Sequence, residues 1–266
     1  MSASLHAPTL ASETLGMIGG LHIRNTMIMA WMTMLLLILP VLVMKMRGYK
    51  RVPGRFQMLL ELIVEGITDF VDSVIQDRKV TRRIVPMIAT FFLFIMFANW
   101  LGIVPGVGSI TLRAMHEGVM SNIPVFRSMN ADVNMTLAFT LISVIATQVL
   151  GITSIGIFSY AGKYFVAPWK KPYGIGTIVG LLEFIGEFAR VIAFTFRLFG
   201  NIFAGEVLLV VISFLVPYIV PIPFLGLEIF VGFVQALVFS LLTVSFIKMA
   251  MTAHGEHPEE HAPAHA

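Results

Sequence analysis

Residues 175–215 read IGTIVGLLEFIGEFARVIAFTFRLFGNIFAGEVLLVVISFL and form a long apolar segment. It contains no proline, so no residue in it forces a helix to end. A continuous helix of this length would measure about 60 Å at 1.5 Å per residue. A bilayer's hydrocarbon core is only about 30 Å thick. We therefore expect a long helix that lies strongly tilted in a membrane, or bends at a glycine, and presents a lengthwise face to a neighbour.

The rest of the chain also has the composition of a membrane protein. Of its 266 residues, 57% are hydrophobic and only 12% are charged, whereas soluble domains carry about 25% charged residues. Four further runs approach the length of about 20 residues that a membrane helix needs: Thr26 to Val43, Ile84 to Val104, Met135 to Tyr160 and Phe224 to Ile247. We predict an all-α polytopic membrane protein with about five transmembrane helices, the last two long and strongly tilted.

An additional helix is predicted from Phe56 to Gln76, between the first two crossings. Acidic residues recur there at spacings of four, four and three, which places them in one stripe along a helix: Glu61, Glu65, Asp69 and Asp72. A continuous acidic face is costly in hydrocarbon, so we place this helix along the membrane interface. A short water-facing helix packed on other subunits is the alternative.

Basic residues predict the orientation of the crossings. Thirteen lysines and arginines fall in segments on one side of the five crossings, and three fall on the other side. The positive-inside rule then places the N-terminus outside and the C-terminus in the cytoplasm.

We divide the chain into a polar N-terminal segment (1–24), a membrane domain (25–252) and a His-rich tail (253–266), which we interpret as disordered rather than as a metal site. The absence of cysteine excludes disulfide and thiolate chemistry.

Charged side chains also occur inside the long apolar segment. Glu183, Arg190 and Arg197 follow one another at intervals of seven, which keeps them on one face of a helix, and Asn201 extends this stripe. Glu206 is nine residues after Arg197 and falls on the opposite face. In the last segment, Glu228 and Gln235 are seven apart and share a face.

Arg197 has no acid within reach on its own helix. An ionisable group at bilayer depth is costly unless it faces protein or a wet cavity, so each one suggests a functional site. Arg190 could simply pair with Glu187 or Glu183, and Glu206 and Glu228 could be buried structural carboxylates. For Arg197, the in-register acid Glu183 lies about 21 Å away along the axis. A partner must therefore come from another helix or another subunit.

Four ordered motifs resemble one family. The run from Phe196 to Glu206, FRLFGNIFAGE, looks like the signature of subunit a of the F-type ATP synthase. ANWLG at residues 98–102, ADVNMTLA at 131–138 and VQALVF at 234–239 resemble other helix segments of that family, in the same order. The resemblance extends over about residues 53–251, and the predicted five crossings agree with it.

The resemblance implies a stator subunit that lies against a rotating c-ring, with the peripheral-stalk subunit b and membrane lipid as further partners. Two offset aqueous half-channels would load and unload protons on the ring carboxylates. Arg197 matches the essential arginine of the family, Gln235 its partner and Asn201 a neighbour of that arginine. Glu206 and Glu228 match positions in the outer half-channel, and Glu183 matches an acid at the cytoplasmic mouth. Some members pair a histidine with a carboxylate where this chain has two carboxylates, which could share a proton.

The sequence also indicates what the chain does not do alone. It contains no P-loop of the form GxxxxGK[ST], so we expect no direct ATP binding, no catalysis by this chain alone and no cofactor. We expect no nucleic-acid partner either. H⁺ is the expected coupling ion, and a bacterial plasma membrane is the expected location, with an energy-transducing organelle membrane as the alternative. An independent ion-coupled secondary transporter and a structural membrane anchor are the competing functional hypotheses.

Overall fold

The computed structural model describes residues 12–104, 106, 110–116, 119–164, 175–217 and 219–251. Within these residues it is an all-α membrane protein with two small β-hairpins. Five helices are long and apolar enough to cross a membrane, which confirms the predicted number. They are α1 (Asn25–Arg47), α3 (Arg78–Ile103), α4 (Val133–Ile155), α6 (Ile175–Leu215) and α7 (Pro221–Met251).

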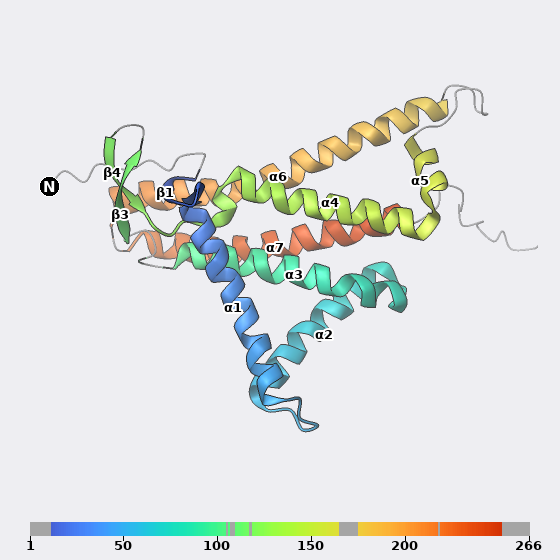
Figure 1. Ribbon diagram of the computed structural model, residues 1–266, viewed down its shortest axis with the longest axis horizontal. Coiled ribbons are helices and arrows are strands. Elements are labelled where there is room, and N and C mark those ends of the chain that lie inside the picture. Colours follow the sequence, from blue (N-terminus) through green and yellow to red (C-terminus); the bar gives the residue numbers. More distant parts are fainter. Residues whose placement is uncertain are drawn as a thin grey trace, which may run out of the picture.

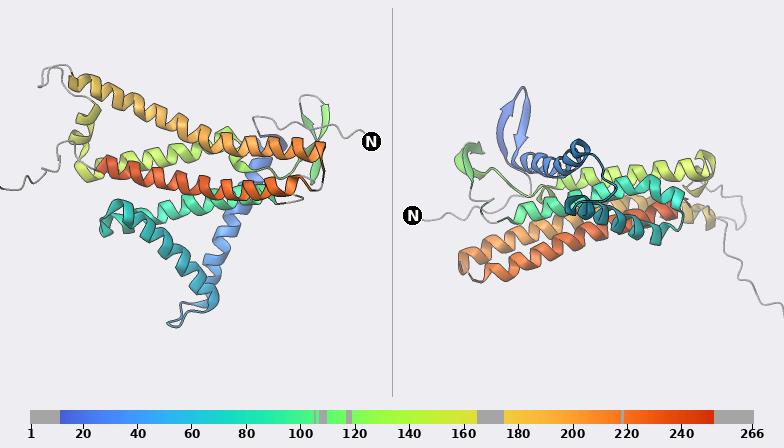
Figure 2. Two further views of the ribbon diagram at one scale, coloured as in Figure 1. Left: turned by 180° about the vertical axis from the view of Figure 1, so that it is seen from behind. Right: turned by 90° about the horizontal axis from the view of Figure 1, so that it is seen from below.

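The long helix α6 is continuous over 41 residues, as its lack of proline predicts. It runs along the longest dimension of the molecule together with α3, α4 and α7, and its N-terminal half diverges from α7 (Figure 1 and Figure 2). Helix α1 crosses this group steeply (Figure 1). Because of this crossing, α1 and the α6–α7 pair cannot both stand upright in one bilayer. The strong tilt of α6 and α7 relative to the membrane stays a prediction.

The third predicted crossing ends earlier than expected. Helix α4 stops at Ile155 instead of continuing to Tyr160, and a short helix α5 (Ile157–Tyr164) follows in a new direction (Figure 1). Gly156 separates the two helices with a positive φ of 83°, which glycine adopts more easily than other residues. Its N–H still donates to the Ile152 carbonyl.

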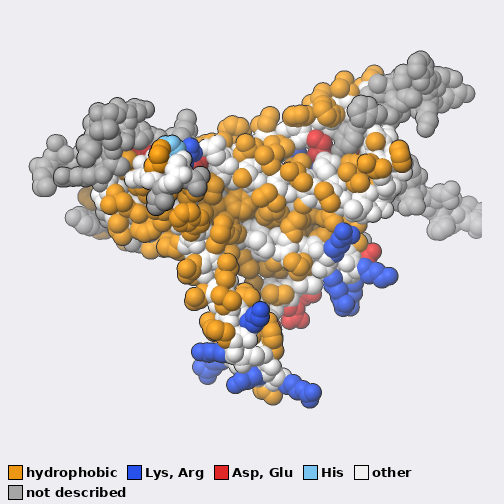
Figure 3. Space-filling view, viewed as in Figure 1, with side chains coloured by type: hydrophobic (Ala, Val, Ile, Leu, Met, Phe, Trp, Pro, Cys, Tyr) orange, Lys and Arg blue, Asp and Glu red, His pale blue; other side chains and the backbone are white. Residues whose placement is uncertain are grey.

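The amphipathic helix is confirmed as α2 (Arg55–Ile75). Its apolar face packs into a core formed with α3 and α7, where Ile67, Val71 and Ile75 are buried. Side chains of Lys and Arg gather where α1 leads into α2 and at the corner between α2 and α3 (Figure 3). The acidic residues Glu61, Glu65 and Asp69 are exposed, so the helix has one packed face and one charged face.

Two antiparallel hairpins were not predicted. The first pairs β1 (Thr14–Ile18) with β2 (Leu21–Arg24), within the segment expected only to be polar, and the second pairs β3 (Thr111–His116) with β4 (Val119–Pro124). Gly19 and Gly20 make the first turn with positive φ values of 58° and 88°, where a side chain would be strained. Both hairpins lie toward the end of the molecule where α6 connects to α7 (Figure 1). The His-rich tail lies outside the described residues.

An aromatic cluster fixes the middle of α6 against the other helices. The rings of Phe91 on α3 and Phe194 on α6 both contact Phe239 on α7, with centroid separations of 5.6 Å and 5.3 Å. Phe139 on α4 contacts Phe91 at 6.5 Å. These large rings bury apolar area with little conformational freedom. The cluster therefore positions the α6 turn that precedes Arg197.

Candidate functional site

Arg197 lies in the exposed surface of α6 and forms no ion pair with any residue in the described parts of the chain. Its guanidinium carbon lies 5.9 Å from the ring centroid of Phe194, three residues earlier on the helix. That distance is at the outer limit of a cation–π interaction. The prediction that Arg197 has no acid within reach on its own helix is confirmed, and the other described helices do not supply one.

Asn201 and Gln235 meet next to this arginine. The Asn201 side-chain amide donates a hydrogen bond of 2.9 Å to Gln235 Oε1, which links α6 to α7. Gln235 is only 5% exposed, whereas Asn201 is exposed one helical turn beyond Arg197. Two residues selected from separate segments of the sequence are thus brought into direct contact. Their bond holds the polar face of α7 against the arginine-bearing part of α6.

Arg190 has partners of its own, so it differs from Arg197. Its Nη1 pairs with Glu187 Oε2 at 2.8 Å, and its guanidinium stacks on the ring of Phe246 from α7 at 3.7 Å. This confirms that Arg190 can be satisfied locally, by the acid three residues earlier. Glu183, predicted at the far end of the same stripe, is half-buried in the N-terminal half of α6. The structure does not bring it together with Arg197.

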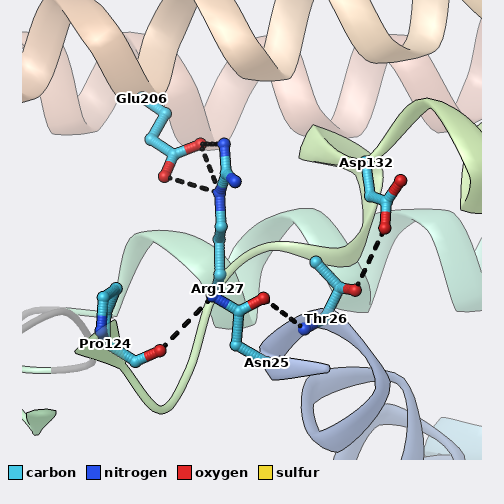
Figure 4. A network of polar contacts seen from close by, with 6 residues as sticks. All are labelled: Asn25, Thr26, Pro124, Arg127, Asp132 and Glu206. Carbon is cyan, nitrogen blue, oxygen red and sulfur yellow. Dashed lines mark hydrogen bonds and ion pairs between the residues drawn. The ribbon is translucent and has the colours of Figure 1, made fainter. Parts of the chain in front are cut away.

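Glu206 forms a bidentate ion pair with Arg127 at the other end of α6 (Figure 4). Arg127 Nε lies 3.0 Å and 3.2 Å from the two carboxylate oxygens, and Nη2 lies 3.1 Å from Oε2. The Arg127 side chain is 4% exposed and that of Glu206 is 28% exposed. The paired charges are therefore largely withdrawn from solvent.

Sequence reasoning missed Arg127, which it counted only as a loop cation. A signal was nevertheless present, since an acid in an apolar helix needs a cation and only three arginines were assigned to the outer side. The loop that carries Arg127 is held by a polar network (Figure 4). Asn25 Nδ2 donates to the Pro124 carbonyl at 3.4 Å, and Thr26 Oγ1 donates to Asp132 Oδ2 at 3.3 Å. These contacts attach the start of α1 to the residues on both sides of Arg127.

Glu228 is seated against the backbone of α6 beside Glu206. It is 7% exposed, and a Cβ added to Gly205 would lie 1.9 Å from Glu228 Oε1. Only a glycine allows the carboxyl group to approach α6 so closely. The sequence pattern identified both acids, but it did not identify Gly205 as the residue that allows Glu228 to lie next to Glu206.

A second polar group joins α3 to α7 near these acids. Asn99 donates to the Gly232 carbonyl at 3.2 Å and accepts a bond of 2.6 Å from the side-chain amide of Asn130. Trp100 Nε1 donates to the Ile229 carbonyl at 3.0 Å. Asn99 and Asn130 are buried, so these amides supply polar groups in an otherwise apolar interface. The ANWLG segment therefore meets the residue that directly precedes the ADVNMTLA segment.

The surface of α6 around Arg197 carries small residues. Gly186, Ala189, Ala193 and Ala204 are exposed, and Gly200 is partly exposed. At 100° per residue, all five lie within about 80° of the direction of Arg197 around the helix. We call these five residues the small-residue stripe. Glycine and alanine at such spacings let another helix approach the backbone closely.

The fold and the site define a polytopic membrane protein with charged and polar residues on two long, paired helices. The sequence profile of the ATP synthase A chain family matches residues 27–248. The chain belongs to the ATP synthase subunit a family, whose members are subunits of the membrane sector of the enzyme.

Curated relatives cover most of this chain. ATP synthase subunit a of Gloeobacter violaceus is 37% identical over 235 residues, which are 88% of this chain and 86% of the relative. The subunit a of Syntrophobacter fumaroxidans is 35% identical over 224 residues, covering 83% of this chain and 82% of the relative. That of Desulforamulus reducens is 33% identical over 241 residues, covering 88% and 81%. The resemblance inferred from the four motifs is therefore confirmed.

Proposed function

We propose that this chain translocates protons in a rotary ATP synthase, with α6 facing the c-ring and Arg197 as the fixed charge at that contact. The observation that carries the proposal is a contrast between arginines. Arg127 and Arg190 each have a carboxylate partner in the chain, whereas Arg197 has none among the described residues. A cation at bilayer depth needs a counter-charge. A carboxylate on a passing c subunit would supply it.

Arginine suits this role because it keeps its charge at any physiological pH. It cannot carry the proton, but it attracts a deprotonated ring carboxylate and holds it in a polar environment. A fixed positive charge also raises the barrier for a proton that would pass straight between the two half-channels. Net proton flow then requires rotation of the ring.

The small-residue stripe supports a helix contact at this face of α6. An added Cβ at Gly186 or Gly200 would meet no atom within 4 Å, so neither glycine is required for packing inside the chain. Small side chains at the surface of a membrane helix are used where a second helix packs closely. A c-subunit helix placed here would bring its carboxylate next to Arg197 and Asn201.

We assign the outer half-channel to the region of Glu228, Asn99 and Asn130. Because Arg127 neutralises Glu206, Glu228 is the carboxyl left to exchange protons, and Glu206 supports it electrostatically. This assignment replaces the expectation that the two acids share one proton. Glu183 is assigned to the mouth of the cytoplasmic half-channel, on the other side of Arg197.

The orientation proposed is N-terminus outside and C-terminus in the cytoplasm, in a bacterial plasma membrane. The basic residues near the α1–α2 connection and the α2–α3 corner support it, because cytoplasmic loops are enriched in lysine and arginine (Figure 3). The peripheral-stalk subunit b is the second proposed protein partner, and the ATP chemistry belongs to other subunits of the complex.

The deciding experiment replaces Arg197 by alanine in the assembled ATP synthase. We expect ATP-driven proton pumping in inverted membrane vesicles to fall to background, while the amount of assembled complex stays near that of the wild type. Arg24→Ala is the matched control, because Arg24 lies before α1 and donates a 3.4 Å hydrogen bond to Ser12, away from the proposed ring contact. Full pumping by Arg197→Ala would overturn the proposal. Loss of pumping by both variants to the same extent would also contradict it.

A further inference from the structure

Helix α5 lies where the long helices of the molecule are furthest apart. It leaves the end of α4 at Gly156 and contacts both α4 and α6. In two views it bridges the space between the C-terminal ends of α4 and α7 and the start of α6 (Figure 1 and Figure 2). The N-terminal half of α6 diverges from α7 at this end, so α5 spans the separation between them.

The N-terminal half of α6 is held by little apolar packing within the described residues. Among the described side chains of α6, the buried apolar ones begin at Phe194. Four apolar side chains before it are 50–61% exposed, and at 100° per residue they are spread around most of the helix: Leu181, Leu182, Phe184 and Ile185. The remaining face carries charges, and Glu183 and Arg190 are half-buried on it. Contacts other than an apolar core must therefore set the position of this half.

A single side chain anchors α5 over residues 157–162. Of these six residues only Tyr160 is buried, whereas Phe158 is 92% exposed. The Tyr160 hydroxyl donates a hydrogen bond to Gln148 Oε1 on α4. The ring lies directly over Gly151 of α4, where an added Cβ would be 2.5 Å from Tyr160 Cε2. Any side chain at position 151 would occupy the space of the ring, so Gly151 and Gln148 together fix Tyr160.

We propose that α5 is a spacer that holds the N-terminal half of α6 apart from α7, and that Tyr160 is thereby a positioning residue for Glu183. The part that concerns Glu183 rests on the proposed function, which assigns this acid to the mouth of the cytoplasmic half-channel. Ionisable side chains at membrane depth face protein or a water-filled cavity. If α6 closed onto α7 along its whole length, the charged face that carries Glu183 would lose its access to water. The bridge made by α5 prevents this closure.

The first measurement is the distance between α4 and α6 in the assembled ATP synthase. The chain contains no cysteine, so spin labels can be attached at Ile145→Cys on α4 and Leu181→Cys on α6, both of which are exposed positions. Leu181 lies about 160° around α6 from Arg197, away from the proposed ring contact. Accessible cysteines of the partner subunits are replaced, and pulsed electron paramagnetic resonance gives the distance distribution. We expect Tyr160→Ala to shift this distribution to shorter distances by more than its wild-type width.

Two further variants show whether the anchor is specific. Phe158→Ala is the matched control, because it removes an aromatic ring from an exposed position of the same helix, and its distribution should equal that of the wild type. Tyr160→Phe keeps the ring over Gly151 but loses the hydrogen bond to Gln148, so its shift should be smaller than that of Tyr160→Ala. An unchanged distribution in Tyr160→Ala would overturn the proposal, as would an equal shift in Phe158→Ala.

A second pair of variants decides the matter if Tyr160→Ala does not assemble. Tyr160→Phe and Gln148→Ala both remove the hydrogen bond between α5 and α4 and leave an aromatic ring at position 160. Each should shift the distribution in the same direction. The absence of a shift in both would overturn the proposal.

The second measurement is passive proton conduction through the membrane sector after the catalytic sector has been removed. We expect Tyr160→Ala to lower conduction by about tenfold or more, since a displacement of about 1 Å in a functional group can cost about 100-fold. Phe158→Ala should conduct like the wild type. A shifted distance with normal conduction would overturn the link between α5 and the proton route. Lost conduction at an unchanged distance would overturn the spacer itself. The distance does not depend on how protons move, so failure of the spacer is distinguishable from failure of the proposed function.

Discussion

The close approach of Glu228 to α6 makes Gly205→Ala the most informative substitution in this chain. The new Cβ would lie 1.9 Å from Oε1, 2.3 Å from Cδ and 2.4 Å from Oε2 of Glu228. Real Cβ atoms essentially never approach another heavy atom closer than 3.0 Å, so Oε1 must withdraw by about 1.1 Å. Overpacking of this kind costs about 1–3 kcal/mol. A displacement of about 1 Å in a functional group can lower activity about 100-fold.

We therefore expect Gly205→Ala to reduce ATP-driven proton pumping by about 10- to 100-fold in inverted vesicles. Assembly of the complex is measured in parallel by immunoblotting after native electrophoresis. The matched control is Gly226→Ala, because a Cβ at Gly226 would meet no atom within 4 Å. Its pumping should equal that of the wild type.

A second substitution tests whether the cause is steric. Glu228→Asp shortens the side chain by one methylene, about 1.5 Å, which is enough to make room for the new Cβ. We expect the double variant Gly205→Ala/Glu228→Asp to pump better than Gly205→Ala alone. Wild-type pumping by Gly205→Ala would refute the reasoning, because the carboxyl position would then not matter. A double variant that pumps no better than Gly205→Ala would show that the loss has another cause.

Three further predictions concern the contacts around the site. Arg127→Ala leaves Glu206 without its counter-ion, so we expect the free energy of unfolding to fall by about 3 kcal/mol and the melting temperature in detergent to fall by several degrees. Adding Glu206→Gln to the same chain should recover part of this loss, and no recovery would contradict the ion pair. The Asn201–Gln235 hydrogen bond should give a coupling energy of about 1 kcal/mol in a double-mutant cycle of alanine substitutions measured by thermal unfolding, and additive effects would argue against it. Ala193→Leu adds bulk to the small-residue stripe at an exposed position. The free energy of unfolding of the chain should change by less than about 0.5 kcal/mol, while pumping falls at least tenfold. Normal pumping would show that this face does not pack against the ring.

Part of the candidate site could be predicted because it depends on periodicity along single helices. Seven-residue spacing placed Arg190 and Arg197 on one face, and counting along the helix showed that Arg197 lacks an acid of its own. The pairing of Arg190 with Glu187 was left open by the sequence, and the 2.8 Å contact decides in its favour. Residues that act across helices were harder to find. Arg127 lies 79 positions from Glu206, and no local pattern relates the two.

The end of α4 shows a different limit of sequence reasoning. The apolar run continues from Ile155 to Tyr160, so hydropathy predicts one helix to Tyr160. The backbone turns at Gly156 instead, and Gly151 packs where α4, α5 and α7 meet: a Cβ on it would lie 2.5 Å from Tyr160 and 3.1 Å from Ala250. A glycine inside an apolar run is compatible with a helix or with a turn. Packing against other helices selects between them.

The number of crossings, the amphipathic helix α2, the continuity of α6 and the isolation of Arg197 along its own helix could all be read from the sequence. These features follow from hydropathy, periodicity and the absence of proline, which act over short distances along the chain. Which polar groups meet became visible only in the packed helices: Asn201 with Gln235, Arg127 with Glu206, and Glu228 with the backbone at Gly205. The same packing leaves Arg197 without an ion-pair partner from any other described helix. Contacts between helices depend on how their surfaces pack, and packing is a property of all the helices together.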